Sequence, residues 1–276
     1  MNVTPPFRTT SFGSRILYYA QLALGSVVWG SALIFGTYIL LFYAWAYVSG
    51  NTSQWNEVLP GLYDSESRGS TIGIAIHFLA GGIILILGCL QLVDRVRVKY
   101  PRVHRIVGRV YVMAALAAAL GGLVFIALKG TIGGTVMNAA FTGYGLLMGL
   151  AAIQTVRYAR AADFVRHRAW AIRLFALAIG SWLYRMGYGF YIGFSDQTGH
   201  TADFTGWFDY FMDFAFYLPN LAIAQLFIIR RSWYRQKTGL QLVAASFLFL
   251  LCLLLLFATY FFVRELWGPG IMSAFE

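Results

Sequence analysis

Residues 71–93, TIGIAIHFLAGGIILILGCLQLV, run directly into residues 94–105, DRVRVKYPRVHR. The first stretch contains no acidic residue, lysine or arginine, and it is long enough to cross the roughly 30 Å hydrocarbon core of a bilayer as an α-helix. The second stretch is strongly basic. Because basic loops remain on the cytoplasmic side of a membrane, the two stretches together predict a membrane crossing and its direction.

The same alternation recurs along the whole chain. Basic loops near residues 95–105, 157–168 and 230–237 alternate with acidic ones, which places the N-terminus in the cytoplasm and the C-terminus outside. The sequence therefore predicts an all-α, polytopic helix bundle, a single domain over residues 1–276 with seven transmembrane helices in the inner (plasma) membrane. The expected spans are Ser26–Val48, Thr71–Val93, Ile106–Leu128, Gly133–Thr155, Ala169–Tyr191, Phe208–Ile229 and Gly239–Val263.

Composition excludes a soluble domain of any size. Hydrophobic residues make up 59% of the 276 residues and charged residues 12%, and the longest expected loop, Gly50–Ser70, is too short to bury a core. A net charge of +10 would suggest nucleic acid as the partner of a soluble protein. In a membrane protein it follows from orientation, and it predicts attraction to anionic lipids at the cytoplasmic face rather than to nucleic acid.

Three ionisable side chains are expected at one depth in the outer half of the membrane: His77, Arg185 and Asp213. One interpretation is an ion pair between Arg185 and Asp213, since a guanidinium in the membrane needs an acceptor. The other is an outer pocket with Asp209 at its rim, which could bind a quinone or a metal ion or carry a proton relay. His200 is expected in a solvated loop.

A second polar group is expected at the cytoplasmic face, where His104 and His167 open two helices. These imidazoles could tie the helix entrances to nearby carbonyls or lipid phosphates. Alternatively, they could be the two iron ligands of a haem b, with neighbouring arginines pairing with its propionates. Those arginines are Arg105, Arg109, Arg168 and Arg173.

Two local features bear on helix geometry. Pro219 removes a backbone donor from the sixth span and predicts a kink there. Gly108, one turn after His104, could let a helix or a flat cofactor approach closely.

Several of these residues carry a family resemblance. The string His77, Gly81-Gly82, Leu87-Gly88, Gln91 and Arg95 is followed by PRVHRIVGRVY at residues 101–111 and HRAWAIR at residues 167–173. Together they resemble the membrane family known as domain of unknown function 2306, over about residues 71–185. The resemblance implies a four-helix core at residues 71–193 and supports the choice of site residues, but it implies no reaction.

A looser likeness is to the ascorbate-dependent two-haem cytochrome b proteins, in which four successive helices carry one histidine each. His104 and His167 would match the inner pair, and His77 would match half of the outer pair. Ala140 stands where the second outer histidine would be. The likeness therefore implies one haem at most.

Three functions remain open from the sequence. The leading hypothesis is a b-type haem and quinone redox protein, which as an enzyme would be a membrane oxidoreductase. A second is a proton-coupled small-molecule transporter that uses His77, Arg185 and Asp213, although the sequence gives no indication of paired broken helices. The third is a structural or accessory subunit of a larger membrane complex.

Overall fold

The computed structural model describes residues 11–229 and 238–275, and within these ranges the chain is helical with no β-strand. Six helical segments in this part of the chain are long and apolar enough to cross a membrane. They confirm the predicted helical membrane protein. The six candidates are Phe12–Ser49, Arg68–Leu92, Pro101–Leu128, Gly134–Arg160, Trp207–Ile229 and Thr238–Phe275.

Three of the six candidates are single helices, whereas the first and the last each contain a short π-helix. The first candidate consists of α1 (Phe12–Tyr38), η1 (Ile39–Ala44) and α2 (Trp45–Ser49), and the last consists of α12 (Thr238–Phe262), η4 (Val263–Trp267), α13 (Gly268–Met272) and η5 (Ser273–Phe275). The three single helices are α4 (Arg68–Leu92), α6 (Pro101–Leu128) and α7 (Gly134–Arg160). The short helices η2 (Thr52–Gln54), α3 (Trp55–Val58) and α5 (Asp94–Lys99) lie in the connections before α4 and before α6.

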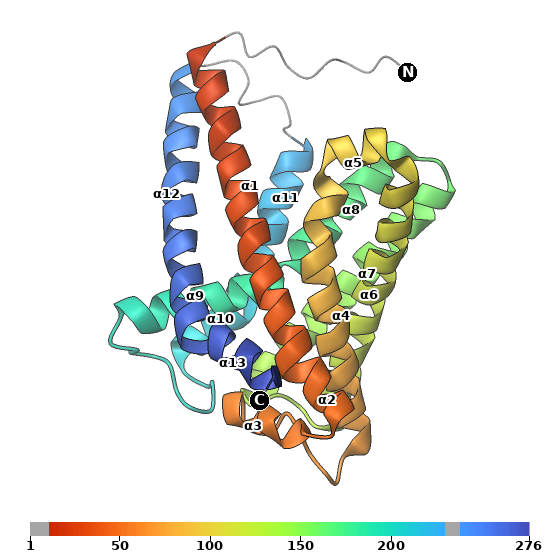
Figure 1. Ribbon diagram of the computed structural model, residues 1–276, viewed down its shortest axis with the longest axis vertical. Coiled ribbons are helices and arrows are strands. Elements are labelled where there is room, and N and C mark those ends of the chain that lie inside the picture. The colour runs from red at the N-terminus through yellow and green to blue at the C-terminus, as the bar shows by residue number, and fades with distance from the viewer. Residues whose placement is uncertain (1–10, 230–237, 276) are drawn as a thin grey trace.

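The predicted fifth span is not one helix. Residues 169–191 fall on α8 (Phe164–Ala178) and α9 (Gly180–Phe194), which meet at Ile179. Each has 15 residues and is about 22 Å long, too short to cross the hydrocarbon core alone. In Figure 1, α9 turns away from α8 and lies across the bundle. The expectation of one straight span is therefore wrong here.

The predicted sixth span is also interrupted. It consists of α10 (Trp207–Ala215) and α11 (Leu218–Ile229), which are separated by Phe216 and Tyr217 just before Pro219. This interruption confirms the kink expected from the missing proline donor. Because α11 packs against α8, the two interrupted segments are neighbours in space.

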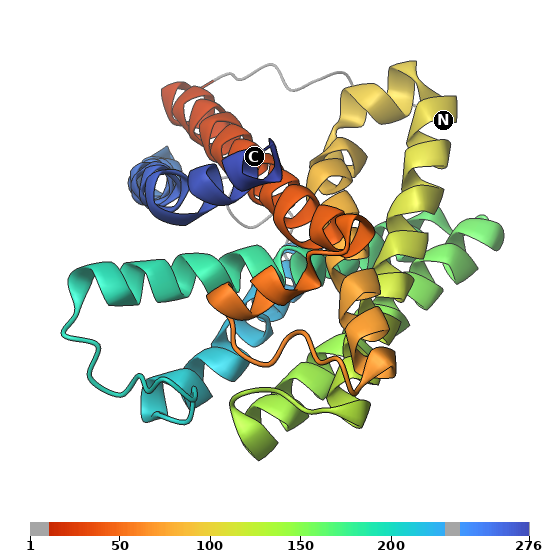
Figure 2. The same ribbon diagram turned by 60° about the horizontal axis from the view of Figure 1, so that its bottom comes forward.

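The remaining helices form the scaffold around these breaks. α1 and α12 pack along each other, α4 packs most extensively against α6, and α7 contacts both α6 and α8 (Figures 1 and 2). The close α4–α6 contact depends on Gly73 and Gly121, because a Cβ added to Gly121 would collide with the Gly73 carbonyl oxygen.

The loop after α2 folds back onto the bundle. Trp55 is fully buried and its Nε1 donates to the Tyr43 carbonyl at 3.1 Å, while the Gln54 amide donates to the Phe42 carbonyl at 2.7 Å. Both acceptors belong to the π-helix η1, where the backbone pairing departs from the α-helical pattern. The loop side chains thus satisfy backbone groups at one end of the bundle.

Candidate functional site

The break between α8 and α9 is held by side chains from other helices. The carbonyl of Ala176 accepts a hydrogen bond from the Asn220 side chain, and that of Leu177 accepts one from the Tyr144 hydroxyl at 2.8 Å. A Cβ at Gly180 would lie 3.1 Å from the Phe216 ring, so a glycine allows the two breaks to pack together. The last carbonyls of α8 are therefore satisfied, and the break is a built feature of the fold.

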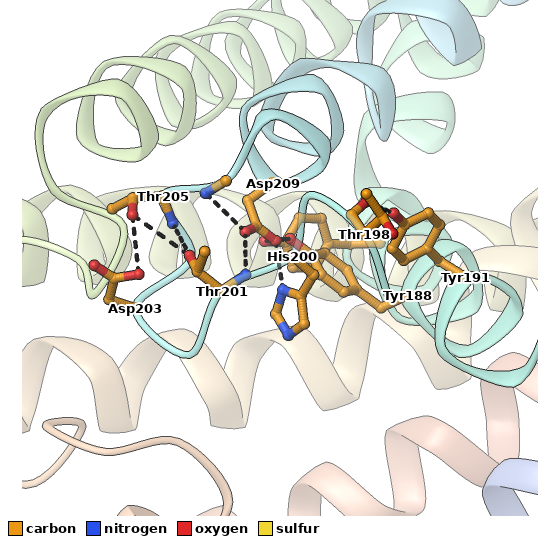
Figure 3. A network of polar contacts seen from close by, with 10 residues as sticks. Tyr188, Tyr191, Thr198, His200, Thr201, Asp203, Thr205 and Asp209 are labelled. Carbon is orange, nitrogen blue, oxygen red and sulfur yellow. Dashed lines mark hydrogen bonds and ion pairs between the residues drawn. The ribbon is translucent and has the colours of Figure 1, made fainter. Parts of the chain in front are cut away.

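Asp209, in the first turn of α10, organises the loop between α9 and α10 (Figure 3). Its Oδ1 accepts hydrogen bonds from the Tyr188 hydroxyl and from His200 Nδ1, both at 2.7 Å. Its Oδ2 accepts from the backbone amides of Thr201 and Gly206, both at 3.1 Å. The side chain is fully buried, and these four donors satisfy the acceptor sites of the carboxylate.

This network corrects the expectation for His200. That histidine was expected in a solvated loop, but its side chain is only 17% exposed and its Nδ1 bonds to Asp209, nine residues later in the chain. Nearby, hydrogen bonds from the side chains of Thr201 and Thr205 lower the pKa of Asp203. Asp203 itself lies in the loop and accepts from the Thr205 hydroxyl at 2.9 Å (Figure 3).

The network continues from the loop into the bundle through two tyrosines on α9. The Tyr184 hydroxyl donates to the Tyr188 hydroxyl at 3.4 Å, and Tyr188 donates to Asp209. Tyr184 in turn lies within electrostatic range of Asp213. Hydroxyl, carboxylate and imidazole groups thus form a chain from the partly exposed His200 to the neighbourhood of a second buried carboxyl.

Asp213 lies one turn after Asp209 and differs from it completely. Its side chain is fully buried, and neither carboxyl oxygen has a hydrogen-bond partner among the described residues. No ion pair with Arg185 is present in residues 11–229 and 238–275. Arg185 instead lies half-buried on α9, within electrostatic range of the phenols of Tyr38 and Tyr43.

His77 takes a separate position in the α4–α6 contact. Its Nδ1 donates to the Ala118 carbonyl at 2.8 Å, and its ring packs beside Gly122. Among the described residues, no hydrogen bond or ion pair joins it to Arg185, Asp209 or Asp213. The structure therefore brings together two of the four expected outer residues, Asp209 and Asp213.

The two inner histidines occupy equivalent places. Each is the fourth residue of its helix, His104 in α6 and His167 in α8, and the two imidazoles lie within electrostatic range of each other. His167 Nδ1 is hydrogen-bonded to the Thr155 carbonyl at 2.9 Å, which leaves its Nε2 lone pair available. His104 Nδ1 is buried and has no hydrogen-bond partner in the part of the chain that the structure describes.

The four arginines expected beside these histidines do not lie together in the structure. Arg105 and Arg109 are exposed, and Arg168 is half-buried. Arg173 points into a cavity, where its Nε and Nη2 donate to the Gln225 side-chain oxygen at 3.0 and 2.6 Å and its guanidinium stacks over Trp170. They do not form one ring around the imidazoles.

The donor groups at the inner site suit an iron ion, but the space beside them is filled. An oriented imidazole such as that of His167 is a typical haem ligand. The region next to Gly108, however, holds the Gln91 side chain, whose Oε1 would lie 2.9 Å from an added Cβ. A porphyrin would fit at Gly108 only after Gln91 moved. In the described part of the chain there is also no cluster of three or more residues able to hold a metal ion.

The structure also reveals polar groups that sequence reasoning overlooked. Gln225 and Asn220 on α11 bond to Arg173 and to the α8 terminus. Three other polar side chains each have a buried atom without a partner among the described residues, and each is a single polar residue within a mostly apolar stretch. These are Gln91, Tyr111 and Gln154.

The comparisons with known proteins agree with the helical membrane architecture. No curated protein matches the chain, and no solved structure matches it. One family model, described as a predicted membrane protein, matches residues 74–228, which is more than half of the chain and includes every site residue discussed above. The chain therefore belongs to the DUF2306 family of membrane proteins.

Proposed function

We propose that this protein is a proton-coupled carrier of a small solute, with Asp213 as its proton-binding group. The observation that carries the proposal is the fully buried Asp213 carboxyl, neither oxygen of which is hydrogen-bonded within the described residues. An isolated carboxylate is very costly in such surroundings. A proton or another cation has to accompany it, and exchange of that ion is the natural basis for coupling.

The paired breaks support a carrier. Secondary transporters commonly bind their substrates where two neighbouring helices are interrupted within the membrane, because unwound backbone and helix ends provide polar groups there. Here the α8–α9 and α10–α11 breaks touch through Gly180 and Phe216, and Asp213 lies one turn before the second break. This pairing is the feature that the sequence did not indicate.

The polar chain supplies a route for the proton. A proton taken up at His200 could pass through the Asp209 carboxylate to the hydroxyls of Tyr188 and Tyr184, and from there reach Asp213. Imidazole, carboxylate and phenol groups can each give and accept protons. Arg185 directly follows Tyr184 on α9, and in this proposal its guanidinium binds the solute or a counter-ion of the solute.

The proposal includes a membrane orientation. It places the α5 end of the bundle in the cytoplasm, beside anionic lipids of the plasma membrane, and counts α8–α9 as a broken crossing, which makes seven. His200 then faces the outside. Labelling of single cysteines at position 97 and position 203 with a membrane-impermeant maleimide in intact cells tests this: only the second should react.

The central test follows the protonation of Asp213 directly. Infrared difference spectra of the protein in liposomes, recorded between about pH 4 and pH 9, should contain the C=O band of a buried carboxyl that titrates in this range. In Asp213→Asn the band should disappear. In the control Asp203→Asn, which makes the same change on the exposed loop, it should persist. A band that survives in Asp213→Asn would contradict the proposal.

The transport step is tested with the same variants in liposomes that contain a pH-sensitive dye. A panel of amino acids, carboxylates and sugars is added outside, and a solute that moves protons with it should acidify or alkalise the lumen. Asp213→Asn should abolish this signal, whereas Asp203→Asn should leave it intact.

A second candidate function is haem binding by His104 and His167, favoured by the hydrogen bond that orients His167. The two residues would ligate the iron of a haem b, which would supply one-electron chemistry when bound. Purified protein from haem-replete cells should then absorb as a low-spin cytochrome, and His167→Ala should remove the bands. A colourless, folded protein would eliminate this candidate.

A further inference from the structure

A cavity of about 370 Å³ lies beside the two breaks, between α7, α8 and α11. Each helix contributes one face to it, with residues three, four or seven positions apart, as expected for neighbours on a helix surface. The walls are almost wholly apolar. Leu147 and Leu150 come from α7, Leu177 from α8, and Leu218 and Leu221 from α11.

One strong charge lies in this cavity, the guanidinium of Arg173. It stacks over Trp170 at 4.7 Å, and two of its N–H groups converge on a single oxygen of Gln225. A guanidinium carries five N–H donors in a planar fork. The Gln225 oxygen is neutral, so it orients the fork and leaves both the charge and further donors available.

No carboxylate balances this charge within the described residues, since the salt bridges there involve other arginines and lysines. Arg173 follows the first residue of α8 by nine positions, a rise of about 14 Å along the helix. An arginine that far along an intramembrane helix is costly without a counter-ion. Its counter-ion is therefore missing from the described residues, and an external anion could take that place.

We propose that this cavity binds a single-chain amphiphile with a carboxylate head, such as a long-chain fatty acid. The carboxylate accepts the paired N–H groups of Arg173 that Gln225 leaves free, a geometry that matches the guanidinium fork. The hydrocarbon chain lies against the leucine walls. The site is separate from Asp213, and the proposal does not depend on the carrier function.

The size and the rim of the cavity favour one chain. Its volume is near the lower end of that of small-molecule sites, enough for a head group and part of one chain. Leu150 and Leu218, on two of its walls, are each 45% exposed and would face lipid in a membrane. The remainder of the chain can therefore leave sideways into the bilayer, which is the environment of a fatty acid.

The test uses the full-length protein in liposomes with a photoactivatable palmitic acid, followed by peptide mapping. Crosslinks are expected on α7, α8 or α11. Arg173→Gln should reduce labelling roughly tenfold to a hundredfold, because a charge-assisted hydrogen bond is lost. The control Arg166→Gln makes the same change in the first turn of α8, where the side chain is 68% exposed, and should leave labelling unchanged.

A second variant guards against a folding defect. Ala222→Phe fills the cavity and leaves Arg173 in place, so it should also prevent labelling. Two further probes define the head group. Photoactivatable hexadecanol, which lacks the carboxylate, should label the cavity weakly, and so should a photoactivatable phosphatidylglycerol with two chains.

Three outcomes would overturn the proposal. Absence of crosslinks on these three helices in the wild-type protein would mean that the cavity does not take up the fatty acid. Equal labelling by palmitic acid and hexadecanol would show a neutral site. Stronger labelling by phosphatidylglycerol would identify an anionic phospholipid site instead.

Discussion

Asp209 and Asp213 lie one turn apart on α10 and are both fully buried, yet their surroundings are opposite. Asp209 accepts four hydrogen bonds, whereas neither oxygen of Asp213 accepts any within the described residues. A buried carboxylate is stable when its acceptor sites are satisfied and costly when they are not. Burial alone therefore does not identify a functional carboxyl, and the partners of each carboxyl decide its role.

The largest effect on stability is expected when Asp209 is changed to asparagine, and the same substitution at Asp213 is its control. Asp209→Asn places an amide N–H₂ against groups that only donate, such as the Thr201 and Gly206 amides. We expect a loss of about 3 kcal/mol in the free energy of unfolding, as when one member of a buried polar network is removed. Unfolding of the purified protein in mixed micelles, monitored by circular dichroism, measures this loss.

Asp213→Asn is the matched control. Since no hydrogen bond is lost there, its free energy of unfolding should stay within about 0.5 kcal/mol of the wild type. Equal destabilisation by the two variants would remove the distinction between a carboxyl held by hydrogen bonds and a carboxyl without partners.

A smaller effect on stability is expected when a buried backbone carbonyl, rather than a carboxylate, loses its hydrogen-bond partner. Asn220→Ala removes the side chain that bonds to the Ala176 carbonyl at the end of α8. A buried carbonyl left without a donor should cost about 1–2 kcal/mol of stability. The same unfolding measurement applies, and Tyr144→Phe, at the Leu177 carbonyl, should behave alike.

Its control is Thr37→Ala, which removes a bond to the Leu33 carbonyl on an exposed helix face. That carbonyl belongs to a continuous helix, so the loss should be a few tenths of a kcal/mol. A similar cost at both sites would mean that the break is not held by these side chains.

The sign of the effect should reverse at Asp213 when the carboxyl is replaced by an apolar group. Asp213→Leu removes a buried polar group without a partner and should stabilise the protein by about 1 kcal/mol. It should also abolish proton coupling, because leucine cannot bind a proton. A carboxyl that is kept for function at a cost in stability should show both effects. Destabilisation by Asp213→Leu would indicate that the carboxyl has a partner in the membrane.

These contrasts explain which features could be predicted from the sequence. The apolar runs and basic loops predicted the helices, and Pro219 predicted one break, because each acts through local backbone or lipid chemistry. The α8–α9 break could not be predicted in this way. Its partners Phe216 and Asn220 lie far along the chain. Gly180 is one of 29 glycines in the chain, and the mostly apolar residues around it do not distinguish it from the others.

The candidate site was predictable to a similar degree. The rarity of charge in the spans identified Asp213 and Arg185 as unusual residues, while Asp209 was expected at the rim of their pocket and Arg173 beside His167. It could not separate Asp209 from Asp213, since both face inward from one helix and differ only in what the loop brings to them. His200 belongs to the Asp209 network because of a loop conformation that no periodic pattern encodes.

The smallest effect is expected at a third carboxyl, which has a partner but faces solvent. Asp64 bonds to Lys129 at 2.9 Å between two loops, and the hydrogen bond from Lys129 lowers the pKa of Asp64. Because the folded-state pKa lies below the unfolded value of about 3.9, the pair contributes stability above that pH and loses it as the pH falls through the folded-state pKa. Lys129→Gln should therefore lower the unfolding temperature slightly near pH 7, by an amount that shrinks as the pH falls below about 3.9 and through the folded-state pKa of Asp64. If the difference in unfolding temperature between wild type and Lys129→Gln stays constant as the pH falls, the ion pair does not stabilise the loops. A hydrogen-bonding partner would then affect the stability of a carboxyl only where that carboxyl is buried.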